Sequence, residues 1–130
     1  MKYVNKYLFT LLVLFQLLHA GTTGKLVGVV IDKISRELLV GANILVNGTN
    51  YGTATDLDGR YFVLQIPPQT YSVTFSMIGY KDVVVKDVQI RVDLTTTLNA
   101  ELEEGVIGMD VVEVTAQRPM VQADVTYSQV

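Results

Sequence analysis

The amino-acid sequence predicts an all-β fold, a seven-stranded antiparallel sandwich preceded by a signal peptide helix. Hydrophobic side chains recur at every second position over much of residues 25–102. Strands with this pattern have one buried face and one face in water, as antiparallel sheets do. Turn-forming residues interrupt the alternation at short intervals, and no stretch of ten residues after position 20 has helical periodicity. Together these observations favour a sandwich over a helical or mixed fold.

Residues 1–20 have the composition of a secretory signal. Lys2 and Lys6 give a positive start, residues 8–18 form an almost unbroken apolar run, and Ala20 is a small residue at the expected cleavage point. The run is short for a bilayer-spanning helix, which takes about twenty residues. We therefore expect a cleaved signal peptide and an exported protein. The alternative is an uncleaved N-terminal anchor helix. No cysteine follows the run, which excludes a lipoprotein.

Four segments have the pattern of a strand. Residues 70–77, 88–94 and 96–102 alternate between apolar and polar side chains. Residues 25–31 form a more continuous β-branched run, which predicts a strand buried on both faces or covered by a loop. The alternating segments share an apolar face made of Tyr71, Val73, Phe75, Met77, Val88, Ile90, Val92, Leu94, Thr96, Leu98, Ala100 and Leu102.

Turn chemistry separates these segments. Asn-Gly and Asp-Gly pairs readily adopt the positive φ angles of tight turns, and paired prolines end a strand because they cannot donate ladder hydrogen bonds. Gly41 is expected at a bulge or a close backbone approach. The tripeptide 47–49 also fits the N-glycosylation pattern, but it coincides with a turn, and we interpret it as turn chemistry. The predicted turns are Asp32-Lys33, Asn47-Gly48, Asp58-Gly59, Pro67-Pro68 and Ile78-Gly79.

The composition argues against catalysis. The only histidine, His19, lies inside the signal peptide, and the chain has no cysteine. The exported part therefore lacks Ser-His-Asp and Cys-His chemistry and ordinary zinc ligands, and no carboxylate pair suggests an acid/base couple. Two of the 10 basic residues leave with the signal while all 13 acidic residues stay, so the net charge falls from −3 to −5. An acidic chain argues against nucleic acid as a partner. We predict no catalytic residues, no cofactor and no metal.

Residues 56–59, with the sequence Asp-Leu-Asp-Gly, resemble the opening of a calcium loop. The third acid and the distal glutamate of such loops are missing. We favour a β-turn in which an aspartate accepts backbone N–H bonds and Gly59 has a positive φ.

Four tyrosines at strand-like positions have two interpretations. They could form a stacking platform for carbohydrate, but tyrosines at strand spacing are more often half-buried in the packing with the hydroxyl in water. We favour packing. The four residues are Tyr51, Tyr61, Tyr71 and Tyr80.

Several of these segments occur in the order found in one family. The segments are 28–32, 39–46, 52–62, 67–71 and 78–81, and their most specific parts are the T-D-x-D-G-x-Y turn, P-x-x-T-Y and I-G-Y. Residues 24–103 resemble the carboxypeptidase regulatory-like domain. The resemblance implies a transthyretin-like (prealbumin-like) sandwich without catalytic activity. Gln69 departs from the glycine that the family usually has before T-Y, which puts the type of that turn in doubt.

The segment after the sandwich has its own resemblance. Residues 104–109 read as a linker with acids and glycines, and residues 110–130 follow it. The V-V-x-V-T-A-x-R pattern is similar to the TonB box and the start of the plug in TonB-dependent outer-membrane receptors. The resemblance implies that the periplasmic energy-transducing protein TonB captures this segment as an added strand. The candidate partner-binding residues are Asp110, Val111, Val112, Glu113, Val114, Thr115 and Ala116.

The predicted function is that of a non-catalytic N-terminal extension domain of a TonB-dependent receptor, in nutrient uptake or signalling, at the periplasmic face of the outer membrane. In that setting the plug and barrel of its own receptor are further partners, and the chain is expected to be a fragment of a longer protein. The alternatives are a free-standing secreted carbohydrate-binding or adhesion module and an accessory domain of a secreted peptidase. Residues 104–130 are expected to be mobile, because isolated extended segments lack hydrogen-bond partners.

Overall fold

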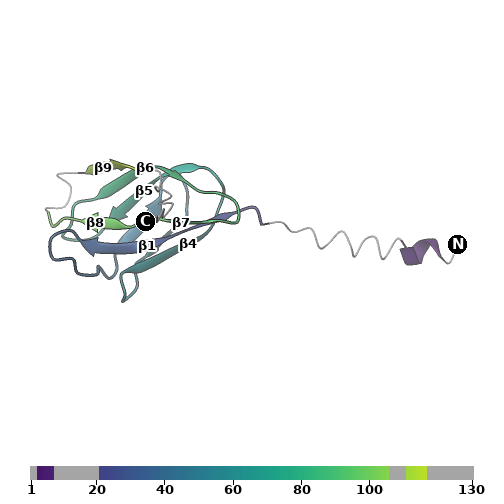
Figure 1. Cartoon of the computed structure of the whole chain (residues 1–130), viewed down its shortest axis with the longest axis horizontal. Coiled ribbons are helices and arrows are strands. Elements are labelled where there is room, and N and C mark those ends of the chain that lie inside the picture. The colour runs from purple at the N-terminus through teal and green to yellow at the C-terminus, as the bar shows by residue number, and fades with distance from the viewer. Residues whose placement is uncertain (1–2, 8–20, 106–110, 117–130) are drawn as a thin grey trace, which may run out of the picture.

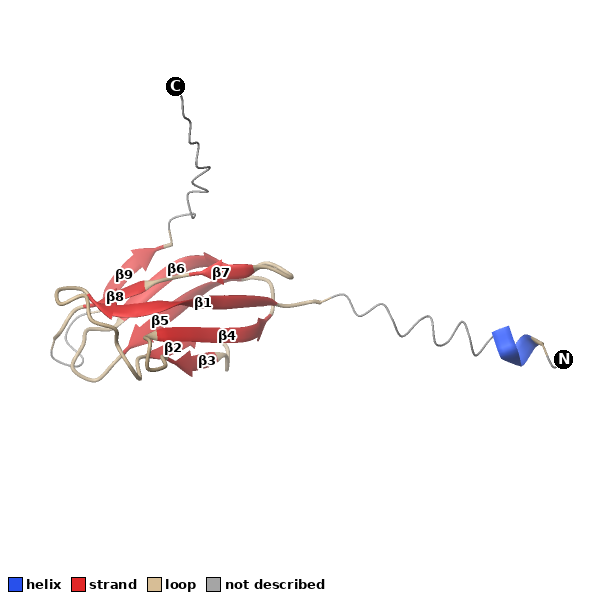
Figure 2. Cartoon of the chain, turned by 60° about the horizontal axis from the view of Figure 1, so that its bottom comes forward, coloured by secondary structure: helices blue, strands red, loops and turns tan. Residues whose placement is uncertain are grey.

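A computed structural model describes residues 3–7, 21–105 and 111–116. Residues 21–105 and 111–116 form two β-sheets that lie face to face (Figures 1 and 2). In the N-terminal region, residues 4–7 form a single helical turn. The apolar run of the predicted signal peptide and its cleavage point lie outside the described residues.

The described residues contain nine strands where the sequence predicted about seven. Their bounds are β1 Gly24–Asp32, β2 Asn43–Val46, β3 Gly52–Ala54, β4 Arg60–Ile66, β5 Thr70–Ser76, β6 Val83–Gln89, β7 Thr95–Thr97, β8 Ala100–Leu102 and β9 Val112–Thr115.

The first sheet has the order β4-β1-β7, with β8 also paired to β1, and the second has the order β3-β2-β5-β6-β9. The prediction of a sandwich is confirmed. Pairing is antiparallel except in three places: β7 and β8 run parallel to β1, and β9 runs parallel to β6. These exceptions differ from the purely antiparallel expectation. They arise because the chain after β6 crosses to β1 in the first sheet and then returns to β6 in the second.

The core lies between the sheets. At its centre the rings of Tyr61 and Phe75 meet edge to face, with centroids 5.7 Å apart and planes at 71°. Burial of large side chains such as these stabilises a domain by about 1.5–3 kcal/mol each, and no disulfide contributes because the chain has no cysteine. The buried apolar side chains are Leu26, Val30, Leu39, Ala42, Ile44, Val46, Tyr61, Val63, Ile66, Tyr71, Val73, Phe75, Val83, Val85, Val88, Ile90, Ala100 and Leu102.

Two of the predicted strands differ in the structure. The prediction of a strand at residues 88–94 is wrong. Strand β6 starts earlier and ends at Gln89. Beyond it, Asp93 has a φ of 56°, and Val92 and Leu94 are exposed. The segment 96–102 is divided into β7 and β8. At the division the backbone N–H of Val29 finds its acceptor in the Asn99 side chain, 3.0 Å away, instead of in a ladder carbonyl. The strand predicted at 70–77 is confirmed as β5.

The Asp58-Gly59 turn is confirmed, with Gly59 at a φ of 66°. For Gly41, the expected close approach of the backbone is wrong. An added Cβ there meets nothing within 4 Å, so the site has room, and what favours glycine is a φ of 80°.

Candidate functional site at the β6–β9 edge

Most of the candidate partner-binding residues lie at one edge of the second sheet. Residues 112–115 form β9, which pairs in parallel with residues 83–86 of β6, so that Val112 is opposite Val83 and Thr115 is opposite Lys86. Figure 2 shows β9 beside β6 at the end of this sheet. Val111 and Ala116 flank the strand, and Asp110 lies outside the described residues. The expectation that this segment lacks partners is therefore wrong for residues 111–116.

Backbone hydrogen bonds hold both ends of β9. The N–H of Val112 donates to the carbonyl of Asp82 at 2.9 Å, and the N–H of Ala116 donates to the carbonyl of Lys86 at 2.6 Å. Because a strand repeats every two residues, the N–H of Val114 also faces β6, whereas the N–H groups of Glu113 and Thr115 face away from it. One edge of β9 is thus occupied by β6, and the outer edge has no strand beside it among the described residues.

The side chains of β9 add little burial. All four residues of the strand are exposed, with Val112 at 40% and Val114 at 46% of their full exposure. Ala116 is partly buried against the core. By contrast, the inward side chains of β5 are 8% exposed or less. Since apolar burial is the main source of strand stability, β9 is held chiefly by its backbone.

One ion pair links the two strands through their side chains. The Nζ of Lys86 donates to a carboxylate oxygen of Glu113 at 2.7 Å, and both side chains are about half exposed, at 46% and 61%. Exposed pairs of this kind contribute about 0–1 kcal/mol and are screened by salt. The pair therefore favours the observed register without holding it strongly.

A bulge in β6 coincides with the end of the β9 ladder. Tyr71 of β5 pairs with Val88, but Val73, two residues later, pairs with Val85, so β6 carries one extra residue. Asp87 at that point has a φ of 60°. A bulge bends a strand and locally disrupts pairing. The ladder with β9 ends next to it, at Lys86.

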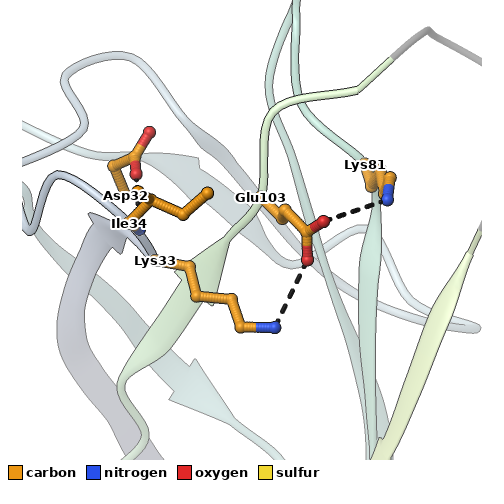
Figure 3. Close-up of polar contacts among 5 residues, drawn as sticks. All are labelled: Asp32, Lys33, Ile34, Lys81 and Glu103. Atoms are coloured by element: carbon orange, nitrogen blue, oxygen red, sulfur yellow. Dashed lines mark hydrogen bonds and ion pairs between the residues drawn. The ribbon is translucent and has the colours of Figure 1, made fainter.

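An ionic clamp fixes the chain where it leaves the sandwich after β8. The carboxylate of Glu103 accepts hydrogen bonds from the Nζ of Lys81 at 3.2 Å and from the Nζ of Lys33 at 3.3 Å (Figure 3). Hydrogen bonds from these two ammonium groups hold the pKa of Glu103 below its ordinary value. Backbone bonds continue the attachment: Lys81 N–H donates to the carbonyl of Glu103, and Gly105 N–H donates to that of Gly79. The described chain is therefore anchored through Gly105.

A buried carboxylate supports the same end of the sandwich. Asp32 is 5% exposed, and its Oδ1 accepts the N–H groups of Ile34 at 2.7 Å and Ser35 at 2.9 Å. Its Oδ2 accepts the hydroxyl of Tyr80 at 3.0 Å. The backbone N–H bonds from Ser35 and Ile34 are the main reason that the pKa of Asp32 is lowered, and desolvation followed by the bond to Asp32 raises the pKa of Tyr80. All of these hydrogen bonds are structural. The bond from Tyr80, the tyrosine of the I-G-Y motif, links the loop between β5 and β6 to the end of β1.

The Asp56 turn has the geometry of a structural turn. The Oδ1 of Asp56 accepts the N–H groups of Asp58 at 2.9 Å and Arg60 at 3.0 Å. No group of three or more potential metal ligands occurs within the part of the chain that the structure describes. This carboxylate therefore acts as a backbone acceptor.

The four tyrosines do not form a platform. Tyr61 and Tyr71 are buried, and their hydroxyls donate to the carbonyls of Leu98 at 2.6 Å and Pro67 at 2.9 Å. Burial raises the pKa of Tyr61. Tyr80 donates to an aspartate, as described above. The interpretation as packing is confirmed for Tyr61, Tyr71 and Tyr80, with the difference that their hydroxyls bond to protein groups, and Tyr51 also packs partly buried against the core.

Sequence reasoning singled out residues 110–116 but missed the groups that hold them. Lys86 and the clamp of Lys33, Lys81 and Glu103 were not singled out, because their partners are 22 to 70 residues away in the sequence. Within residues 3–7, 21–105 and 111–116, the structure contains no helix with the length and apolar character needed to cross a membrane.

The fold is a β-sandwich with an added edge strand, and comparison with known families agrees with it. The sequence model of the CarboxypepD_reg-like domain matches residues 26–114, which is more than half of the chain and includes most of β9. The chain belongs to this family.

Two curated relatives are receptors or transporters. The chain is 43% identical over 63 residues to a TonB-dependent receptor of Formosa agariphila, a match that covers 48% of this chain and 6% of that protein. It is 29% identical over 107 residues to the TonB-dependent transporter Oar of Myxococcus xanthus, covering 78% of this chain and 10% of that protein. The chain thus spans a tenth or less of the length of these relatives.

Among solved structures, the Bacillus anthracis TIE protein is similar, with a TM-score of 0.53 and 24% sequence identity over 64% of this chain and 17% of that one. At that identity the likeness describes the fold alone.

Proposed function

We propose that this domain is a non-catalytic N-terminal extension of a TonB-dependent outer-membrane receptor that serves nutrient uptake or signalling. Its place is the periplasmic face of the outer membrane, reached through the predicted signal peptide. The remaining plug and barrel of the receptor follow in the same protein. Residues 110–116 are the segment that the periplasmic energy-transducing protein TonB captures as an added strand.

One observation carries this proposal: the segment that resembles the TonB box adopts a strand at a sheet edge. Residues 112–115 alternate, are exposed on both faces, and lie at the edge of the second sheet. Strand addition uses main-chain hydrogen bonds for affinity and alternate side chains for specificity. The relation to two TonB-dependent proteins supports the choice of partner class.

A binding experiment with a synthetic peptide tests the proposal. A peptide of residues 108–118 should bind the purified periplasmic domain of an energy-transducing protein from the same genome, measured by calorimetry. The Val112→Pro peptide, which lacks one backbone donor, should bind at least about tenfold more weakly. A scrambled peptide of the same composition is the control. Equal binding of the scrambled and native peptides, or no binding of either, contradicts the proposal.

The two other functions have less support. A carbohydrate-binding module needs an exposed aromatic surface. Of the tyrosines considered for it, Tyr61 and Tyr71 are buried and Tyr80 is bonded to Asp32, although Phe62 of β4 is 56% exposed. A glycan array probed with the full chain should give no hits, and a specific hit would favour the adhesion alternative. An accessory domain of a secreted peptidase requires a catalytic domain elsewhere in the protein, and both curated relatives are TonB-dependent proteins instead.

A further inference from the structure

The β6–β9 ladder determines which backbone groups of the candidate segment are already in use. The N–H of Val112 donates to Asp82, just before β6, and that of Ala116 donates to Lys86 of β6. The N–H of Val114 faces β6 by the two-residue repeat. Only Glu113 and Thr115 within β9 direct their N–H groups outward. Half of the hydrogen-bonding capacity of the strand is therefore occupied within the domain itself.

The outer edge of the docked strand is a poor platform for a partner. Its ladder is only four residues long and ends beside the Asp87 bulge. Two outward N–H groups offer few bonds to offset the translational and rotational freedom that a partner loses on binding. When β9 leaves β6, both edges of the segment become available along its whole length.

Release of β9 has a low cost compared with the inner strands β2, β5 and β6 of its sheet, each of which has buried apolar side chains. Val112 and Val114 are almost half exposed, and the linking ion pair is exposed as well. Local opening is easiest where few apolar contacts are buried. Because the clamp at Glu103 holds the chain through Gly105, β9 can leave while the sandwich stays intact.

From these observations we infer that β9 is self-masked: β6 competes with the partner for residues 112–116, and capture requires β9 to leave β6. This inference rests on the proposed function for the identity of the partner. The masking itself is a property of the isolated chain. In this arrangement the chain binds a strand-capturing partner more weakly than the free peptide does, since only the open fraction is competent.

Amide hydrogen exchange on the full chain measures the masking without any partner. The N–H groups of Val112, Val114 and Ala116 should exchange more slowly than those of Glu113 and Thr115, because only the first three face the segment of residues 82–86. All of them should exchange faster than the amides of the central strand β5. Equal, fast exchange at all five positions would show that β9 is not docked and overturns the inference.

A disulfide lock then tests whether capture needs release. Val84 and Glu113 are opposite each other in the β6–β9 ladder, and neighbouring strands lie about 4.8 Å apart, within the range that a disulfide bridges. Since the chain has no cysteine of its own, V84C/E113C gives one defined bridge, and its reduced form is the matched control. A second control, N43C/A54C, bridges β2 to β3 at the other edge of the sheet.

The probe is the purified periplasmic domain of the energy-transducing protein used for the peptide. Oxidised V84C/E113C should bind it at least about tenfold more weakly than the reduced form, and N43C/A54C should bind equally in both states. Equal binding of oxidised and reduced V84C/E113C would mean that the partner adds to the outer edge of docked β9, which overturns the inference. If neither the chains nor the free peptide bind, the proposed function fails, and the exchange pattern still decides whether β9 is masked.

Discussion

Gly28 lies in the middle of β1, opposite the point at which β7 ends and β8 has not begun. A Cβ atom added there would lie 1.9 Å from the carbonyl oxygen of Leu98 and 2.9 Å from a ring carbon of Tyr61. The backbone of Leu98 cannot easily move, because hydrogen bonds hold it on both sides. Its carbonyl accepts the Tyr61 hydroxyl at 2.6 Å, and its N–H donates to the carbonyl of Val27 at 2.8 Å. The change Gly28→Ala therefore forces two hydrogen-bonded backbone segments apart.

The expected cost is at the upper end of the range for overpacking, about 3 kcal/mol. For a domain of this size that corresponds to a fall in Tm of roughly 10–20 °C. Gly41→Ala is the matched control, because it adds the same methyl group where nothing lies within 4 Å. Its φ of 80° alone should cost about 1–2 kcal/mol.

Thermal unfolding followed by circular dichroism, together with urea titration of both variants, measures the difference. Gly28→Ala should lose more stability than Gly41→Ala at an unchanged m-value. A loss for Gly28→Ala equal to or smaller than that for Gly41→Ala would refute the reasoning, since it would mean that the Leu98 backbone can shift at little cost.

Three further predictions concern polar groups. Tyr61→Phe leaves the partly buried carbonyl of Leu98 without its hydroxyl donor and should cost about 1–2 kcal/mol in urea unfolding, and an unchanged midpoint would contradict this. In the folded protein the pKa values of Asp32 and Glu103 lie below their ordinary 3.8 and 4.5. Their contribution to stability is therefore complete above those ordinary values and is lost as the pH falls below them. The double variant D32N/E103Q should lose stability less steeply between about pH 5 and pH 3, and a slope like that of the unchanged chain would count against this. Lys86→Met removes the ion pair with Glu113 and should speed exchange at the β9 amides slightly in low salt; a difference that persists in molar salt would argue against an electrostatic cause.

The candidate site could be located from the sequence but not understood from it. The alternating valines of residues 111–116 and their place after the sandwich mark them as an exposed strand without a fixed partner. Their pairing with β6 depends on residues 83–86, which the sequence pattern did not mark as a strand because three consecutive valines hide the alternation. The consequence is specific to Val112: its N–H, expected to serve a partner, is bonded to Asp82.

The sequence by itself determined the features that depend on neighbouring residues: period-two alternation, the Asp-Gly turn at Gly59, and the lack of histidine after His19. These are local because steric limits on φ and the strand repeat act over a few residues. Tertiary structure alone decided which strands pair, that β7, β8 and β9 run parallel to their neighbours, and that Glu103 is clamped by two lysines. Such pairings join residues far apart in the chain, and they form only when the packing of the whole sandwich brings these residues together. The pairing of β9 with the free edge of β6 is one example.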